Sequence, residues 1–202
     1  MPRISASTVA EHHANIEAQL IAAAEEFLRA NPRARLTAGE VSERVGIARN
    51  SIYRYVESVD DLAGLVIARH LPTWVEAVDQ AVSEAGPDPI DRLVAWTRAN
   101  IDEAVRTGHA WLMEAARAQP SRSSDEAART AHAALRDRLI ALWEELPVGS
   151  TQRAAAAAAI TNGIVESGFH LLESSAPPRL VVDLACQAVR GLAREMKAGA
   201  PA

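Results

Sequence analysis

The sequence predicts an all-α protein of about nine helices, and three observations support that fold class. Apolar residues recur with the 3.6-residue period of an α-helix, whereas strand-like alternation is absent over any useful length. Hydrophobic residues make up 49% of the 202 residues, and 42 of the 202 are Ala, which has the highest helix propensity. Clusters of Gly, Pro and Ser separate the helical stretches. A chain of this length can bury a core without disulfides or metals.

The first predicted helix begins near residue 8 and ends near residue 31. Its buried face is formed by apolar residues at helical spacing, namely Ile16, Leu20, Ala23, Ala24, Phe27 and Leu28. We expect His12 and His13 on the solvated surface of this helix. Pro32 ends the helix, because proline disfavours helical conformation at the residue before it.

A compact pair of short helices follows. Thr37 and Glu40 stand three residues apart as in a capping box, which predicts that a helix begins here. Gly46 ends this helix, because Gly adopts the positive φ of a sharp turn without strain. A second short helix is predicted over residues 49–56, and a long helix with a kink at Pro72 comes after it.

The rest of the chain divides into helices at turn-forming segments. These segments are residues 86–89, 107–108, 120–124, 147–150 and 174–178. No repeat of fixed period stands out. We therefore predict two domains, a helix-turn-helix domain of three helices over residues 1–60 and a larger helical domain over residues 61–202.

The charge distribution distinguishes the second short helix from the rest of the chain. The formal net charge of −5 argues against a general nucleic-acid coat protein, whereas residues 44–56 contain three Arg and no acid. Two short helices joined by a Gly turn form a helix-turn-helix, whose second helix enters the major groove of DNA. Arg49 and Asn50 begin that helix and can bond the edges of guanine and adenine. The candidate phosphate contacts are the hydroxyls of Ser51, Tyr53 and Tyr55.

The spacing of residues in this segment is similar to that of a known family. The matching positions are Thr37, Val41, Val45, Gly46, Ile47, Ser51, Ile52, Tyr53, Tyr55 and Leu62. Through them, residues 16–65 resemble the tetracycline-repressor (TetR-like) family of bacterial regulators. The resemblance implies a homodimer that binds a near-palindromic operator in double-stranded DNA and is released when a small hydrophobic effector binds the C-terminal domain. The expected DNA-binding residues are Thr37, Arg49, Asn50, Ser51, Tyr53, Arg54 and Tyr55.

Three positions depart from the family pattern. Ala48 stands where a capping side chain is usual, and the loss of such a cap costs about 1 kcal/mol. Val59 stands where a Lys is common, and Val56 where a Phe is common. These departures favour weaker DNA binding. The candidate residues also have plainer explanations, in which Tyr53 is a core aromatic and Arg49, Asn50, Arg54 and Tyr55 are ordinary solvated surface.

The four Trp residues all lie beyond residue 60, each on a different predicted helix. Aromatic walls with a few polar groups are typical of ligand pockets. We predict an effector pocket lined by Trp74, Trp96, Asn100, Trp111, Met113, Glu114, Trp143, Asn162, Glu166 and His170. Glu166 and His170 are spaced i,i+4 and can touch. The alternatives are that each Trp only fills core and that the Glu–His pair is structural or lies on the surface.

The last two predicted helices are apolar around more than one face, so each must be buried on more than one side. The predicted dimer face consists of Ile160, Gly163, Ile164, Gly168, Leu171, Leu184, Ala188 and Leu192. Its two glycines permit close approach of helix backbones. Two such helices from each subunit can form an intermolecular four-helix bundle, and the alternative is a monomeric core.

Several other classes of protein are disfavoured. Cys186 is the single cysteine, so no intramolecular disulfide can form, and a reducing cytoplasm is the expected location. No signal-peptide core is present, and the longest apolar run, residues 154–160, is too short to span a bilayer. Motifs of nucleotide-binding, hydrolytic and metal enzymes are absent, so we expect no enzyme activity, cofactor or metal. The alternative function is a helical sensor for small molecules or protein partners, with weak or no DNA binding.

Overall fold

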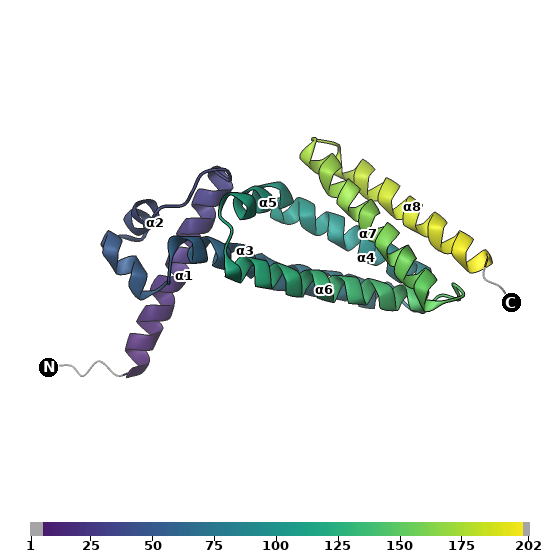
Figure 1. Cartoon of the computed structure of the whole chain (residues 1–202), viewed down its shortest axis with the longest axis horizontal. Helices are drawn as coiled ribbons and strands as arrows, with labels where there is room; N and C mark the ends of the chain where they lie inside the picture. Colours follow the sequence, from purple (N-terminus) through teal and green to yellow (C-terminus); the bar gives the residue numbers. More distant parts are fainter. Residues whose placement is uncertain (1–5, 200–202) are drawn as a thin grey trace. The chain divides into compact units, whose positions relative to one another are not determined.

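The computed structural model describes residues 6–199, which form nine helices and no strand (Figure 1). The helices are α1 (Ala6–Ala30), α2 (Ala38–Val45), η1 (Arg49–Arg54), α3 (Val59–Glu84), α4 (Pro89–Thr107), α5 (His109–Ala118), α6 (Arg122–Glu144), α7 (Thr151–Glu173) and α8 (Pro178–Ala198). The predicted all-α class and the approximate number of helices are confirmed for this part of the chain.

Two helix boundaries differ from the sequence-based prediction. The second short helix is a 3₁₀-helix, η1, which ends at Arg54 rather than near residue 56. Helix α6 begins at Arg122, inside the expected 120–124 linker. It begins there because the hydroxyl of Ser121 accepts the backbone N–H of Ser124 (3.2 Å) and so caps the helix.

The chain folds into two compact units. The first contains the described residues up to His70 together with Trp111–Ala128. The second contains Leu71–Ala110 together with the described residues from Arg129 onward. Helices α3, α5 and α6 each contribute residues to both units.

The core of the first unit joins α1, α2, η1 and the beginning of α3. Leu20 and Leu28 of α1 are completely buried in it, on the apolar face that the sequence predicts. Val41 of α2, Ile52 of η1 and Leu62 of α3 are also completely buried there. Burial of each such side chain contributes on the order of 1.5–3 kcal/mol. This core therefore anchors the inner side of both short helices.

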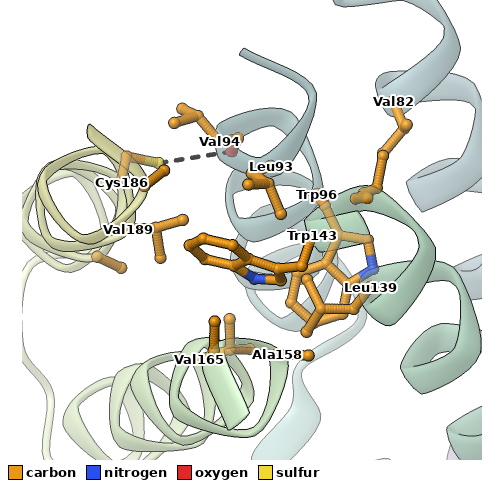
Figure 2. Packing of buried hydrophobic residues seen from close by; sticks show 14 of the residues in the cluster. Val82, Leu93, Val94, Trp96, Leu139, Trp143, Ala158, Val165, Cys186 and Val189 are labelled. Carbon is orange, nitrogen blue, oxygen red and sulfur yellow. Dashed lines mark hydrogen bonds between the residues drawn. The ribbon is translucent and has the colours of Figure 1, made fainter. Parts of the chain in front are cut away.

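The core of the second unit is built from α4, α6, α7, α8 and the later part of α3, around Trp96 and Trp143 (Figure 2). Trp96 and Trp143 are 1% and 0% exposed. The indole N–H of Trp143 donates to the hydroxyl of Thr161 (3.1 Å), so this polar group is buried with a partner. Cys186 is buried in the same core as a small, mainly apolar side chain, and burial raises the pKa of its thiol.

Candidate functional site

The beginning and end of α2 are fixed by the two local signals that the sequence contains. The Thr37 hydroxyl accepts the backbone N–H of Glu40 (3.3 Å), and the Glu40 carboxylate accepts the backbone N–H of Thr37 (3.1 Å). Gly46 ends the helix with φ of 75°, in the left-handed conformation that favours Gly. The predicted capping box and Gly turn are confirmed, and they lead the chain directly into η1.

Helix η1 presents one side to the core and the other to solvent. Ile52 is completely buried, whereas Arg49, Asn50 and Arg54 are exposed. The Tyr53 side chain, 55% exposed, also lies on the outer side. Tyr53 is therefore a surface residue rather than the core aromatic that the sequence also allowed.

The other three predicted DNA contacts are less freely available. Ser51 and Tyr55 are half-buried, and Tyr55 packs against the core of the first unit. Thr37 is exposed, but its hydroxyl donates to the Glu40 carboxylate (2.6 Å). A phosphate bound by the Thr37 hydroxyl would have to compete with that carboxylate for the proton.

The surface around η1 carries the positive charge that the sequence predicts. Arg44, Arg49 and Arg54 are all exposed, and residues 44–56 contain no acid. The guanidinium of Arg44 lies 5.6 Å from the ring centroid of Phe27, an arrangement that restricts the side chain without neutralising its charge. At the N-terminus of η1, Ala48 makes no side-chain capping bond, because its methyl side chain has no hydrogen-bonding atom.

A contact that sequence reasoning missed lies at the other end of η1. His13 Nε2 of α1 lies 3.0 Å from the carbonyl oxygen of Arg54, and the imidazole lies against the Tyr55 ring with 4.8 Å between centroids. His13 is exposed, as expected, but it is not simply solvated. The two residues of the hydrogen bond are 41 positions apart, so no local pattern could have linked them.

Trp74 lies among aromatic and polar side chains of the second unit. Its indole N–H donates to the Asn100 side-chain oxygen (3.0 Å), and the Asn100 amide donates to the Trp96 carbonyl (2.8 Å). The His109 and Phe169 rings stack with 4.5 Å between centroids, and each centroid lies 5.9 Å from that of Trp74. Sequence reasoning missed His109 and Phe169, which come from different helices. Trp74 and Asn100, two of the predicted pocket residues, are thus in direct contact and both are buried.

Three of the predicted pocket residues, Trp111, Met113 and Glu114, belong to the first compact unit. The guanidinium of Arg29 lies 4.5 Å from the Trp111 ring centroid, and Arg33 donates to a carboxylate oxygen of Glu114 (2.8 Å). Met113 is half-buried. The sequence did not reveal this assignment, because α5 is one continuous helix that passes from one unit to the other.

The polar candidates on α7 are exposed to solvent. The Asn162 amide donates to the Glu166 carboxylate (2.7 Å), and His170 Nδ1 lies 3.4 Å from the Glu173 carboxylate. Each member of the predicted Glu166–His170 pair therefore has another partner. The reason is geometric, because Asn162 and Glu173 also stand three or four residues away on the same helix and compete for the same contacts.

An apolar groove of about 370 Å³ runs between α7 and α8 in the second unit. Its walls are formed by Ile160, Gly163, Ile164, Ser167, Gly168, Leu171, Val181, Leu184, Ala185 and Ala188. Seven of the eight predicted dimer-face residues are among them, and the eighth, Leu192, is half-buried against the core. Ile160, Leu171 and Leu184 are 55%, 48% and 53% exposed, and large apolar side chains exposed together in one groove are typical of interaction surfaces.

The groove lies directly beside the core of the second unit, because α7 packs closely against α4 and α8. A Cβ atom added to Gly168 would lie 3.3 Å from side-chain atoms of Ile101 on α4 and Val181 on α8. The glycine therefore allows the three helices to approach closely.

In the described part of the chain, no helix combines the length and apolar character needed to cross a bilayer.

The fold of residues 6–199 is that of TetR-like transcriptional regulators. At 20% identity, the chain is similar to a TetR-like transcriptional regulator from Rhodococcus sp. RHA1, with a TM-score of 0.63 over 91% of this chain and 96% of that chain. It is 11% identical to the TetR family regulator PfmR from Thermus thermophilus, with a TM-score of 0.60 over 91% and 100% of the two chains. RolR in complex with the ligand resorcinol is 17% identical, with a TM-score of 0.50 over 96% and 98%. No protein-family model and no curated protein matches the sequence.

Proposed function

We propose that the protein is a homodimeric transcriptional regulator, a repressor that binds DNA through residues 1–60 and a small effector through residues 61–202. The observation that carries the proposal is the outer side of η1. There Arg49, Asn50, Tyr53 and Arg54 are exposed on a segment without acids. This segment directly follows α2, which begins at the Thr37 cap and ends at Gly46 in the left-handed conformation. A regulator of this kind acts in the cytoplasm, where its operator is.

DNA contacts are divided by chemistry between base reading and phosphate binding. Arg49 and Asn50 stand at the start of η1, where a recognition helix reaches base edges, and they suit guanine and adenine. Tyr53 and Arg54, together with Thr37, Ser51 and Tyr55, would bind phosphates and set the register. Arg49 is the residue with the largest expected share in specificity, because its fork can bond both acceptors of guanine.

Dimerisation would bury the α7–α8 groove of one subunit against that of another. The exposed Ile160, Leu171 and Leu184 would leave water on association, and Gly163 would let the helices approach closely. A two-fold dimer presents two copies of η1 to half-sites about one turn of DNA apart, which explains why a near-palindromic operator is expected.

Effector binding is assigned to the group around Trp74. The Trp74–Asn100 hydrogen bond and the rings of His109 and Phe169 offer one polar pair beside aromatic surfaces, which fits a small and mainly apolar ligand. The similarity in fold to RolR, whose ligand is the small aromatic resorcinol, supports this class. Trp96, Trp111, Met113, Glu114, Trp143, Asn162, Glu166 and His170 remain weaker candidates. The effector would shift the dimer between two states only by its difference in affinity for them.

The proposal is tested by selecting a binding site from a pool of random DNA duplexes and measuring its affinity by fluorescence anisotropy. We expect the wild-type affinity to fall steeply with rising salt, because phosphate contacts release counterions. Arg49→Ala should lose about 1–3 kcal/mol at the selected site and little on a scrambled duplex. Arg153→Ala, an exposed Arg on α7, is the matched control and should bind like the wild type.

Failure to enrich any duplex would refute the proposal. It would favour the second candidate, a helical sensor that does not bind DNA, to which the missing cap at Ala48 already points.

A further inference from the structure

Helix η1 has few means of stabilising itself. It is six residues long and has 3₁₀ geometry, in which hydrogen bonds are poorer than in an α-helix. Ala48 at its N-terminus makes no side-chain capping bond. Its position must therefore depend on contacts with other elements. On the inner side these are Ile52, which is completely buried, and Val56, which is 7% exposed.

A separate contact reaches η1 at its C-terminal end, from His13 on α1. A carbonyl oxygen only accepts hydrogen bonds, so His13 Nε2 must carry the proton that it shares with the Arg54 carbonyl at 3.0 Å. The last carbonyls of a helix have no partner within it, and a His that donates to one of them stabilises that end. The other ring nitrogen, Nδ1, lies 3.9 Å from the Glu17 carboxylate on the same helix. The imidazole also rests against the Tyr55 ring, so both a polar and an aromatic contact meet at this point.

We propose that His13 is a positioning residue for DNA recognition. Anchors on the inner side hold η1 to the core but act on one side only, whereas His13 holds the Arg54–Tyr55 end from α1. Together the two sets of contacts define the direction in which Arg49 and Asn50 point. His13 acts through η1 in this role and touches neither base nor phosphate. The inference rests on the function proposed above.

Three variants separate the parts of the contact. His13→Gln keeps an N–H donor at about the place of Nε2, and His13→Phe keeps a ring but has no donor. His12→Ala changes the neighbouring exposed His and is the control. The first measurement, without DNA, is hydrogen exchange at the amides of Tyr55 and Val56, which donate to the Ile52 carbonyl at 2.9 and 3.2 Å. We expect exchange about three- to ten-fold faster in His13→Phe and near wild type in the other two variants.

The second measurement is affinity for the selected duplex over a range of salt concentrations. His13→Phe should bind about three- to ten-fold more weakly, His13→Gln should restore binding, and the slope of affinity against salt should stay the same. A slope reduced by about one would mean that His13 contacts a phosphate itself and would overturn the proposal. If His13→Phe shows the wild-type rate of exchange at the Tyr55 and Val56 amides and binds the duplex as tightly as the wild type, this proposal is overturned and the proposed function is unaffected. Absence of any duplex binding by the wild type would overturn the proposed function, and the role in recognition with it.

Discussion

Replacing Gln119 by Met should destabilise the first unit by removing hydrogen bonds without removing volume. Gln119 is completely buried. Its side-chain oxygen accepts the backbone N–H of Leu36 (2.9 Å), and its amide donates to the carbonyl of Ala34 (3.4 Å). These two bonds tie the segment between α1 and α2 to the end of α5, 83 to 85 positions further along the chain. Met is unbranched and fills nearly the same space as Gln, so the change tests the polar contacts themselves.

The magnitude follows from the group that is left without a partner. Leu36 is buried, so its amide cannot turn to water, and an unsatisfied buried donor costs about 1–3 kcal/mol. The longer bond to Ala34 adds about 0.5 kcal/mol, and burial of the more apolar Met side chain offsets on the order of 1 kcal/mol. We expect a net loss of about 0.5–2.5 kcal/mol, equivalent to a fall in Tm of roughly 1–10 °C for a chain of this size.

Chemical denaturation and hydrogen exchange at the Leu36 amide measure the two consequences separately. Gln119→Met should lower the unfolding free energy and speed exchange at Leu36. Gln19→Met is the control, because Gln19 is exposed on α1 in the same unit and such changes usually stay within about 0.5 kcal/mol. Equal stability of the two variants, with the Leu36 amide still protected, would refute the reasoning, since it would mean that this amide has another acceptor.

Two further predictions concern association and pH. Leu184→Glu places a charge in the α7–α8 groove, so the variant should sediment as a monomer where the wild type sediments as a dimer, and a variant that stays dimeric excludes the groove as the interface. Burial lowers the pKa of His70 from its ordinary value of 6.5, although the Glu25 carboxylate lies 3.1 Å from its Nε2. Below about pH 6.5 the unfolded chain therefore binds more protons than the folded chain. The stability of the fold is fully present above that pH and decreases as the pH falls below it. Denaturation at several pH values should show a smaller decrease for His70→Gln, and equal slopes would contradict this account.

Local signals made much of the helix-turn-helix predictable. Thr37 and Glu40 meet because they stand three residues apart at a helix start, and any fold that forms this helix brings them together. Gly46 adopts a positive φ because other residues would be strained there. The apolar face of α1 and the +3 segment around η1 follow from periodicity and residue type alone.

Elsewhere, residue types alone did not distinguish between alternative local structures and contacts. Ser121 lies in a stretch that resembles a linker, yet its hydroxyl caps α6 and shortens the loop. Glu166 and His170 are correctly spaced to touch, but Asn162 and Glu173 are spaced as well and are the partners observed. The pattern of residue types does not distinguish these alternatives, because their free energies differ by only a few tenths of a kcal/mol.

The sequence on its own was sufficient for the approximate number of helices, the capping box of α2, the turn at Gly46 and the cationic segment, since each depends on residues within about four positions of one another. Packing of helix faces decided which distant residues meet. It brought His13 to the end of η1, Gln119 to the amide of Leu36, and His109 and Phe169 to Trp74. It also placed Trp111 in the first unit and left the α7–α8 groove exposed. A stripe of apolar residues indicates only that this face of a helix is buried. Which helix packs against that face depends on the close packing of all the helices together.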